Sequence, residues 1–162
     1  MLLNEIEDWF PRWKIFQKDA ATSGTNPCGE IVLKSKEFCN LTEVVARAED
    51  TEETLMEKVR LATILGTYQS SLTNFSYLSK EWKKNCDEER LLGVSITGQW
   101  DSPAVRNDEL LRKLRDKAIE INKQYAAKMK INPSSAITCV KPSGTVSQLV
   151  DSSSGLHARH SQ

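Results

Sequence analysis

The sequence of 162 residues lacks several features that would assign it at once to a broad class. It has no excess of charge, because 22 Lys and Arg residues offset 22 Asp and Glu residues, and this excludes a global basic field for nucleic acid. No apolar run approaches the roughly 20 residues that cross a membrane. Residues 1–10 contain acids where a signal peptide would be basic. We therefore expect a cytoplasmic globular protein without a nucleic-acid or membrane partner.

The cysteines lack the Cys-x-x-Cys spacing of a structural zinc ribbon. Two histidines, His157 and His160, lack a carboxylate or thiolate close to them in the sequence, and we expect no metal site. In a reducing compartment, cysteines are buried, bind metals or take part in catalysis more often than they form structural disulfides. There are four of them, at positions Cys28, Cys39, Cys86 and Cys139.

One short stretch places a thiol between an amide and a carboxylate: Thr25-Asn26-Pro27-Cys28-Gly29-Glu30. Pro27 fixes φ before the thiol and Gly29 permits unusual angles after it, which predicts a tight turn with Cys28 at its tip. Such a set can supply a radical or nucleophilic centre, an orienting group and a general base. The alternative is a surface turn with an incidental cysteine.

The rest of the chain predicts an α/β architecture with parallel strand pairing. Thr51 and Asn107 cap two long helices, each with acidic residues in its first turn. The apolar stripe of the first helix is expected to include Leu65 and to extend to Leu72. The residues expected in strands are 31–33, 41–45, 91–97 and 136–140, and a charged connection is expected over 80–90. Cys86 is then expected to be exposed to solvent without a functional role, and Cys139 is expected to be a buried thiol of the core.

A second polar stretch, Lys141-Pro142-Ser143-Gly144-Thr145-Val146-Ser147-Gln148, directly follows the last expected strand. Open α/β layers bind ligands at the carboxyl ends of strands. A helix starting near Thr145 would direct its free N–H groups toward a phosphate. The spacing is not that of a P-loop. A plain strand–turn–helix with Ser/Thr capping explains the stretch equally well.

Together these motifs resemble the catalytic subunit of class II ribonucleotide reductases. The resemblance rests on five stretches that occur in order: Asn26–Glu30, Glu37–Leu41, Gly93–Gly98, Lys141–Ser147 and Leu149–Ser161. It implies thiyl-radical reduction of ribonucleotides, with triphosphates as the expected substrates. It also implies adenosylcobalamin as cofactor, a thioredoxin-like reductant as partner, and nucleotide effectors that act through a region absent from this chain.

The resemblance also implies roles for individual residues. Cys28 matches the thiyl-radical cysteine, Glu30 the carboxylate that accepts the 3′-hydroxyl proton, and Asn26 the amide that binds the ribose hydroxyls. Cys39 matches one thiol of the pair that reduces the 2′ position. The residues that match the substrate-phosphate segment are Pro142, Ser143, Gly144, Thr145, Val146 and Ser147.

The fold implied is part of a ten-stranded α/β barrel, incomplete in this chain. Residues 1–162 would form part of that catalytic domain, with a finger loop over 22–31 and a substrate-phosphate turn over 141–148. The cysteine that pairs with Cys39 in the family has no match here, so an internal fragment is expected. Two alternatives remain: a class I-type large-subunit fragment, and a non-catalytic nucleotide-binding fragment.

Overall fold

The computed structural model describes residues 23–159, so the aromatic-rich start of the chain and His160 lie outside it. Among the residues described, no helix is both long and apolar enough to cross a membrane. The elements in chain order are β1 (Gly24–Thr25), β2 (Val32–Leu33), β3 (Asn40–Val45), α3 (Glu52–Ser70), α4 (Lys80–Glu89), β4 (Leu92–Thr97), the 3₁₀ turn η1 (Ala104–Arg106), α5 (Asp108–Met129) and α6 (Thr145–Leu149).

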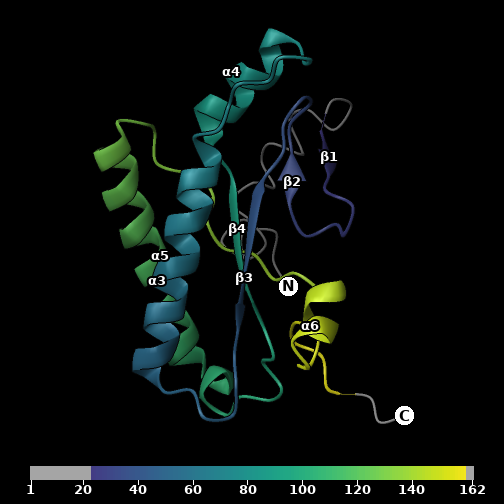
Figure 1. Cartoon of the computed structure of the whole chain (residues 1–162), viewed down its shortest axis with the longest axis vertical. Helices are drawn as coiled ribbons and strands as arrows, with labels where there is room; N and C mark the ends of the chain where they lie inside the picture. Colours follow the sequence, from purple (N-terminus) through teal and green to yellow (C-terminus); the bar gives the residue numbers. More distant parts are fainter. Residues whose placement is uncertain (1–22, 160–162) are drawn as a thin grey trace, which may run out of the picture.

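The central feature is the parallel pair β3–β4, in register from Asn40 opposite Leu92 to Val45 opposite Thr97. Parallel strands need a long crossover connection, and α3 and α4 provide it (Figure 1). The parallel pairing predicted from the sequence is therefore confirmed. The strands β1 and β2 form a separate antiparallel hairpin.

Both long helices begin where their capping residues predict. Thr51 Oγ1 accepts a hydrogen bond from Thr54 N at 3.3 Å, and Thr54 Oγ1 accepts one from Thr51 N at 2.9 Å. Asn107 Oδ1 accepts hydrogen bonds from the first backbone amides of α5, at 2.9 and 3.2 Å. These bonds satisfy amides that lack a partner within the helix.

The predicted apolar stripe of α3 is wrong at its carboxyl end. Leu65 is 65% exposed, and Leu72 lies beyond the helix and is 64% exposed. The buried face continues instead through small and hydroxyl-bearing residues, namely Thr63, Gly66, Thr67 and Ser70. Their hydroxyls donate to backbone carbonyls of the same helix, so they are buried without losing their hydrogen bonds.

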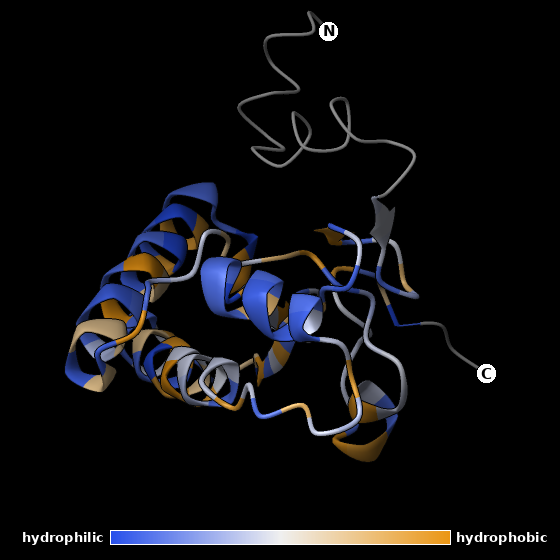
Figure 2. Cartoon of the chain, turned by 90° about the horizontal axis from the view of Figure 1, so that it is seen from above, coloured by the Kyte–Doolittle hydropathy of each residue, from blue (hydrophilic) through white to orange (hydrophobic). Residues whose placement is uncertain are grey.

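The two faces of the β3–β4 pair differ. An added Cβ at Gly66 of α3 would lie 3.0 Å from Leu92 Cδ2, so Leu92 points toward the helices. Leu92, Val44 and Val94 form a core with apolar residues of α3 and α5. Helix α5 is amphipathic, with blue and orange alternating along its ribbon in Figure 2, whereas α3 also carries leucines on its exposed side. The opposite face of the pair carries the hairpin and α6 (Figure 1).

The charged connection predicted over 80–90 is wrong, because Lys80–Glu89 form α4. Cys86 is buried, and burial raises the pKa of its thiol. Trp82 of the same helix packs on Phe38, with ring centroids 6.1 Å apart. A few buried contacts thus hold a helix whose other side chains are mostly charged and exposed.

The strand predicted over 136–140 is only partly right. Thr138 forms an isolated parallel bridge with Val94, and the amide of Cys139 donates to Val94 O at 3.1 Å. The segment therefore runs beside β4 without becoming a regular strand.

Candidate active site

The Cys28 turn forms as its proline and glycine predict. Gly29 N donates to Asn26 O at 2.9 Å, and Gly29 has a φ of +79°. Below the turn, Asn26 Oδ1 accepts a hydrogen bond from Ile31 N at 2.9 Å, and Asn26 N donates to Ile31 O at 3.2 Å. The short hairpin β1–β2 continues this pairing. Cys28 is consequently exposed at the tip of a turn that is tied together at its base.

Glu30 leaves the same turn on the side that faces the protein. Both of its carboxylate oxygens are buried, and neither has a hydrogen-bond partner among residues 23–159. A buried carboxylate without donors is energetically costly, and it provides a strong acceptor for any hydroxyl placed beside it. The hairpin thus presents an exposed thiol and a buried acceptor two residues apart.

Because Gly93 of β4 has no side chain, it leaves the space into which the hairpin packs. An added Cβ at Gly93 would lie 2.5 Å from Leu41 Cδ2, 3.0 Å from Ile31 Cδ1 and 3.1 Å from Cys139 Sγ. These three residues belong to β3, to the hairpin and to the segment beside β4. Gly93 therefore lets all three meet on the face opposite α3.

Cys139 is half-buried on this face rather than in the core behind it. Burial raises the pKa of its thiol to about 12, and the nearby Glu30 carboxylate and Cys39 contribute to the rise. Glu43 adds to the rise, whereas Lys141 opposes it. The thiol therefore stays protonated at neutral pH, and the residues around it come from both predicted site elements.

All four cysteines lie within the described residues, and they form no disulfide. Cys39 immediately precedes β3 and is half-buried. The structure thus places Asn26, Cys28 and Glu30 on one turn, and it places Cys39, like Glu30, near Cys139.

The polar stretch after Cys139 forms a turn and a short helix, and α6 begins at Thr145 as expected. Ser143 Oγ accepts a hydrogen bond from Ser147 N at 3.0 Å, and Ser147 Oγ donates to Gly144 O at 3.1 Å. An added Cβ at Gly144 would meet nothing within 4 Å. The backbone at Gly144 therefore borders open space.

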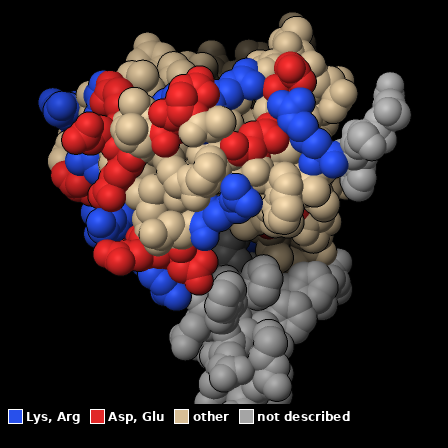
Figure 3. Space-filling view, turned by 90° about the horizontal axis from the view of Figure 1, so that it is seen from below, with Lys and Arg blue, Asp and Glu red and all other residues tan. Residues whose placement is uncertain are grey.

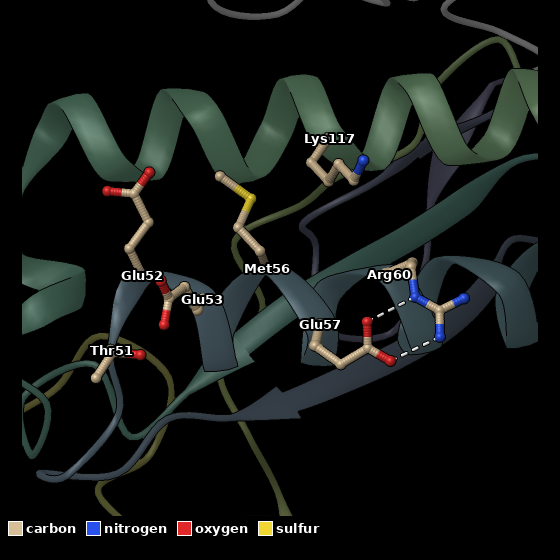
Figure 4. Close-up of a pocket in the computed structure, with 7 residues that line it drawn as sticks. All are labelled: Thr51, Glu52, Glu53, Met56, Glu57, Arg60 and Lys117. Atoms are coloured by element: carbon tan, nitrogen blue, oxygen red, sulfur yellow. Dashed lines mark hydrogen bonds and ion pairs between the residues drawn. The ribbon is translucent and has the colours of Figure 1, made fainter.

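A hollow between α3 and α5 is a poor alternative site for an anionic nucleotide. It is lined by Thr51, Glu52, Glu53, Met56, Glu57, Arg60 and Lys117 (Figure 4). Three carboxylates face only two cations there, and Arg60 is already paired with Glu57, with Nη2 at 2.6 Å from Oε1. Acidic and basic side chains are likewise interspersed over the face shown in Figure 3.

Within residues 23–159, no three His, Cys, Asp or Glu side chains are grouped so that they could hold a metal ion. The sequence did not predict three residues that the structure places near the candidate site. Glu43 has a buried carboxylate oxygen without a hydrogen-bond partner among the described residues, Cys139 joins the two site elements, and Asp101 binds the segment after α6. The position of Asp101 just after β4 was the available signal.

Comparison with known proteins gives consistent matches, although no family model matches the chain. The adenosylcobalamin-dependent ribonucleoside-triphosphate reductase of Lactobacillus acidophilus is 32% identical over 169 residues, which cover 86% of this chain and 22% of that protein. Its namesake from Lactobacillus gasseri is 29% identical over 175 residues, or 88% of this chain and 23% of that protein. A crystal structure of a B12-dependent (class II) ribonucleotide reductase superposes with a TM-score of 0.68 at 27% identity, over 86% of this chain and 23% of that one.

The fold and the matches identify the chain as a relative of the ribonucleotide reductases, with an α/β fold of their type. Within that group, its relatives are the adenosylcobalamin-dependent, class II enzymes, as the resemblance predicted. The chain spans less than a quarter of the length of these relatives.

Proposed function

We propose that this chain is part of the catalytic domain of an adenosylcobalamin-dependent ribonucleotide reductase. The enzyme would reduce ribonucleotides, with triphosphates as the expected substrates, to 2′-deoxyribonucleotides for DNA synthesis. Residues 1–162 would contribute part of a ten-stranded α/β barrel. The observation that carries the proposal is the exposed thiol of Cys28 two residues from the buried carboxylate of Glu30, which has no hydrogen-bond partner among residues 23–159.

Three residues of the turn would each have a task in this reaction. Cys28, as a thiyl radical, takes the hydrogen atom from C3′ of the ribose. Glu30 accepts the proton of the 3′-hydroxyl, which assists loss of the neighbouring 2′-hydroxyl as water. Asn26 orients the ribose hydroxyls through its amide. The hairpin supports these roles because it fixes Asn26 and exposes Cys28.

Adenosylcobalamin, when bound, would supply the radical that converts the Cys28 thiol to a thiyl. The exposed position of Cys28 at the hairpin tip fits this demand, since the thiol is accessible from outside the turn. The adenosylcobalamin dependence of the relatives favours class II over a class I-type large subunit.

Cys39 would donate one of the two reducing thiols. The dithiol gives two electrons to the substrate and becomes a disulfide, which a thioredoxin-like partner re-reduces by thiol exchange. We expect this chemistry in the cytoplasm, where reductants keep thiols reduced. The cysteine that pairs with Cys39 is not assigned among the residues of this chain.

The turn after Cys139 would bind the substrate phosphates through the backbone N–H groups at the start of α6. Its residues in this role are Pro142, Ser143, Gly144, Thr145, Val146 and Ser147. The open space beside Gly144 supports the role, because a phosphate could approach the backbone there.

The test distinguishes the role of Cys28 from that of Cys39 in the complete enzyme. Cys28→Ser should abolish both deoxynucleotide formation and loss of label from 3′-tritiated nucleotide, because an O–H bond is too strong for hydrogen exchange. Cys39→Ser should still release 3′ label but should form decomposed substrate in place of deoxynucleotide. Both variants should bind nucleotide as the wild type does.

Cys86→Ser is the matched control, since Cys86 is buried in α4 and has no role in the proposed reaction, and it should retain both activities. Deoxynucleotide formation by Cys28→Ser would overturn the radical role. Nucleotide binding without turnover by the wild type with cobalamin and reductant present would favour a non-catalytic nucleotide-binding protein.

A further inference from the structure

The segment after α6 is bound to the end of β4 by a dense set of hydrogen bonds centred on Ser153. Ser153 O accepts from Thr97 Oγ1 at 3.0 Å and from Gly98 N at 2.9 Å. Ser153 N donates to Asp101 Oδ2 at 2.7 Å, and Gly155 N donates to Thr97 Oγ1 at 2.8 Å. Ser153 is only 2% exposed, so water cannot readily replace these partners.

The neighbours of Ser153 in turn hold both ends of the turn after Cys139. Ser152 N donates to Ser147 O at 2.9 Å, and Ser154 Oγ donates to Ser143 O at 2.6 Å. These bonds matter because α6 has only five residues and its cap, Gly144, offers no side-chain hydrogen bond. A helix this short has little stability of its own, so the position of the turn depends on residues 152–154.

Two arginines complete the attachment. Arg159 Nε donates to Asp101 Oδ1 at 3.0 Å and Arg159 Nη2 to Asp101 Oδ2 at 3.1 Å, a two-point pair with the carboxylate that also holds Ser153. Arg159 also binds Asp151, with Nη1 at 2.7 Å from Oδ1. From the end of β3, Arg47 donates to the carbonyls of Val150 and Asp151.

We propose that Asp101 is a positioning residue for the substrate-phosphate turn, acting through Ser153 and its two neighbouring serines. Asp101 links the carboxyl end of β4 to that turn, and its hydrogen bonds go to Ser153 and Arg159 rather than to Cys28 or Glu30. The inference rests on the proposed function, because it takes the turn at residues 142–147 as the phosphate site. Asp101 therefore sets substrate affinity rather than the rate of the radical step.

The test compares Asp101→Asn with the wild type in the complete enzyme. Whichever way the amide is turned, an NH₂ group then faces either Ser153 N–H or Arg159. Hydrogen exchange of the amides at residues 143–149 should accelerate while that of α5 is unchanged. The Kd for ribonucleoside triphosphate and the inhibition constant of inorganic tripolyphosphate should both rise about tenfold. KM should rise in parallel, with kcat changed less than about twofold.

Asp116→Asn is the matched control, because Asp116 is an exposed aspartate of α5 that pairs only with the adjacent Arg115 among the described residues. Arg159→Gln is the second variant if Asp101→Asn does not fold, and it should show the same changes at smaller size. Unchanged exchange and unchanged affinity in a folded variant would overturn the positioning role while leaving the proposed function intact. A wild type that neither binds triphosphate nor reduces ribonucleotides would overturn both.

Discussion

At the residue scale, the thiols of this protein differ in environment rather than in chemistry. Cys28 is exposed at the hairpin tip, whereas burial raises the pKa of Cys139 to about 12 and also raises that of Cys86. Since the thiolate is the reactive form, a pKa near 12 leaves about one thiolate in 10⁴ at pH 8. A radical cysteine must be reachable, and among these three only Cys28 is exposed.

This difference predicts an order of alkylation. With iodoacetamide at pH 8, Cys28 should react first, and Cys86 and Cys139 should react more slowly by at least about tenfold. Peptide mass spectrometry over a time course measures the order. In denaturant, the rates should become similar, which serves as the control. Modification of folded Cys139 as fast as Cys28 would contradict the burial described here.

At the element scale, the sequence was sufficient to predict those elements whose hydrogen bonds join residues close together in the sequence. The caps Thr51 and Asn107 and the proline–glycine turn around Cys28 all formed as predicted, because their hydrogen bonds span at most a few residues. Prediction failed for α4, whose charged sequence hides its buried contacts. It also failed at the end of α3, where hydroxyl-bearing residues replace leucine on the buried face.

The tertiary part of the site was not predictable in the same way. Glu43, Asp101 and Cys139 become site neighbours only because β3, β4 and the segment beside β4 lie next to one another. Gly93 is the residue that permits this contact, and a single sequence gives no sign of which side chains will fill the space above a glycine.

Gly93 therefore provides a test of how the hairpin is seated. Gly93→Ala places a Cβ 2.5 Å from Leu41 Cδ2 and 3.0 Å from Ile31 Cδ1, so one of these side chains must move. We expect a loss of unfolding free energy of about 1–3 kcal/mol, measured by urea denaturation. Displacement of Ile31 should also move the adjacent Glu30 and reduce kcat.

Gly144→Ala is the control for this substitution. Its new Cβ meets nothing within 4 Å, so its urea midpoint should stay close to that of the wild type. Equal midpoints for Gly93→Ala and Gly144→Ala would show that the space above Gly93 is larger than described.

At the scale of the whole molecule, the two faces of the β3–β4 pair have different roles. The helical face supplies the apolar core, and the other face carries the hairpin and α6 (Figure 1). Ion pairs at the carboxyl ends of the strands then hold the chain's last described segment in place. The pair between Asp101 and Arg159 should make the stability of the molecule depend on pH.

Hydrogen bonds from Arg159 lower the pKa of Asp101, and the amide of Ser153 contributes to the shift. A lowered pKa in the folded state means that the unfolded chain binds more protons below the ordinary aspartate pKa of about 3.9. The stabilisation is therefore fully present above that pH, and it is lost as the pH falls through the folded pKa of Asp101. Asp101→Asn should be less stable than the wild type at pH 7, with the difference shrinking below about pH 4. Urea midpoints of both proteins between pH 7 and pH 2.5 measure this, with Asp116→Asn as the control. A difference that stays constant down to the lowest pH would show that the ion pair does not stabilise the fold through its charge.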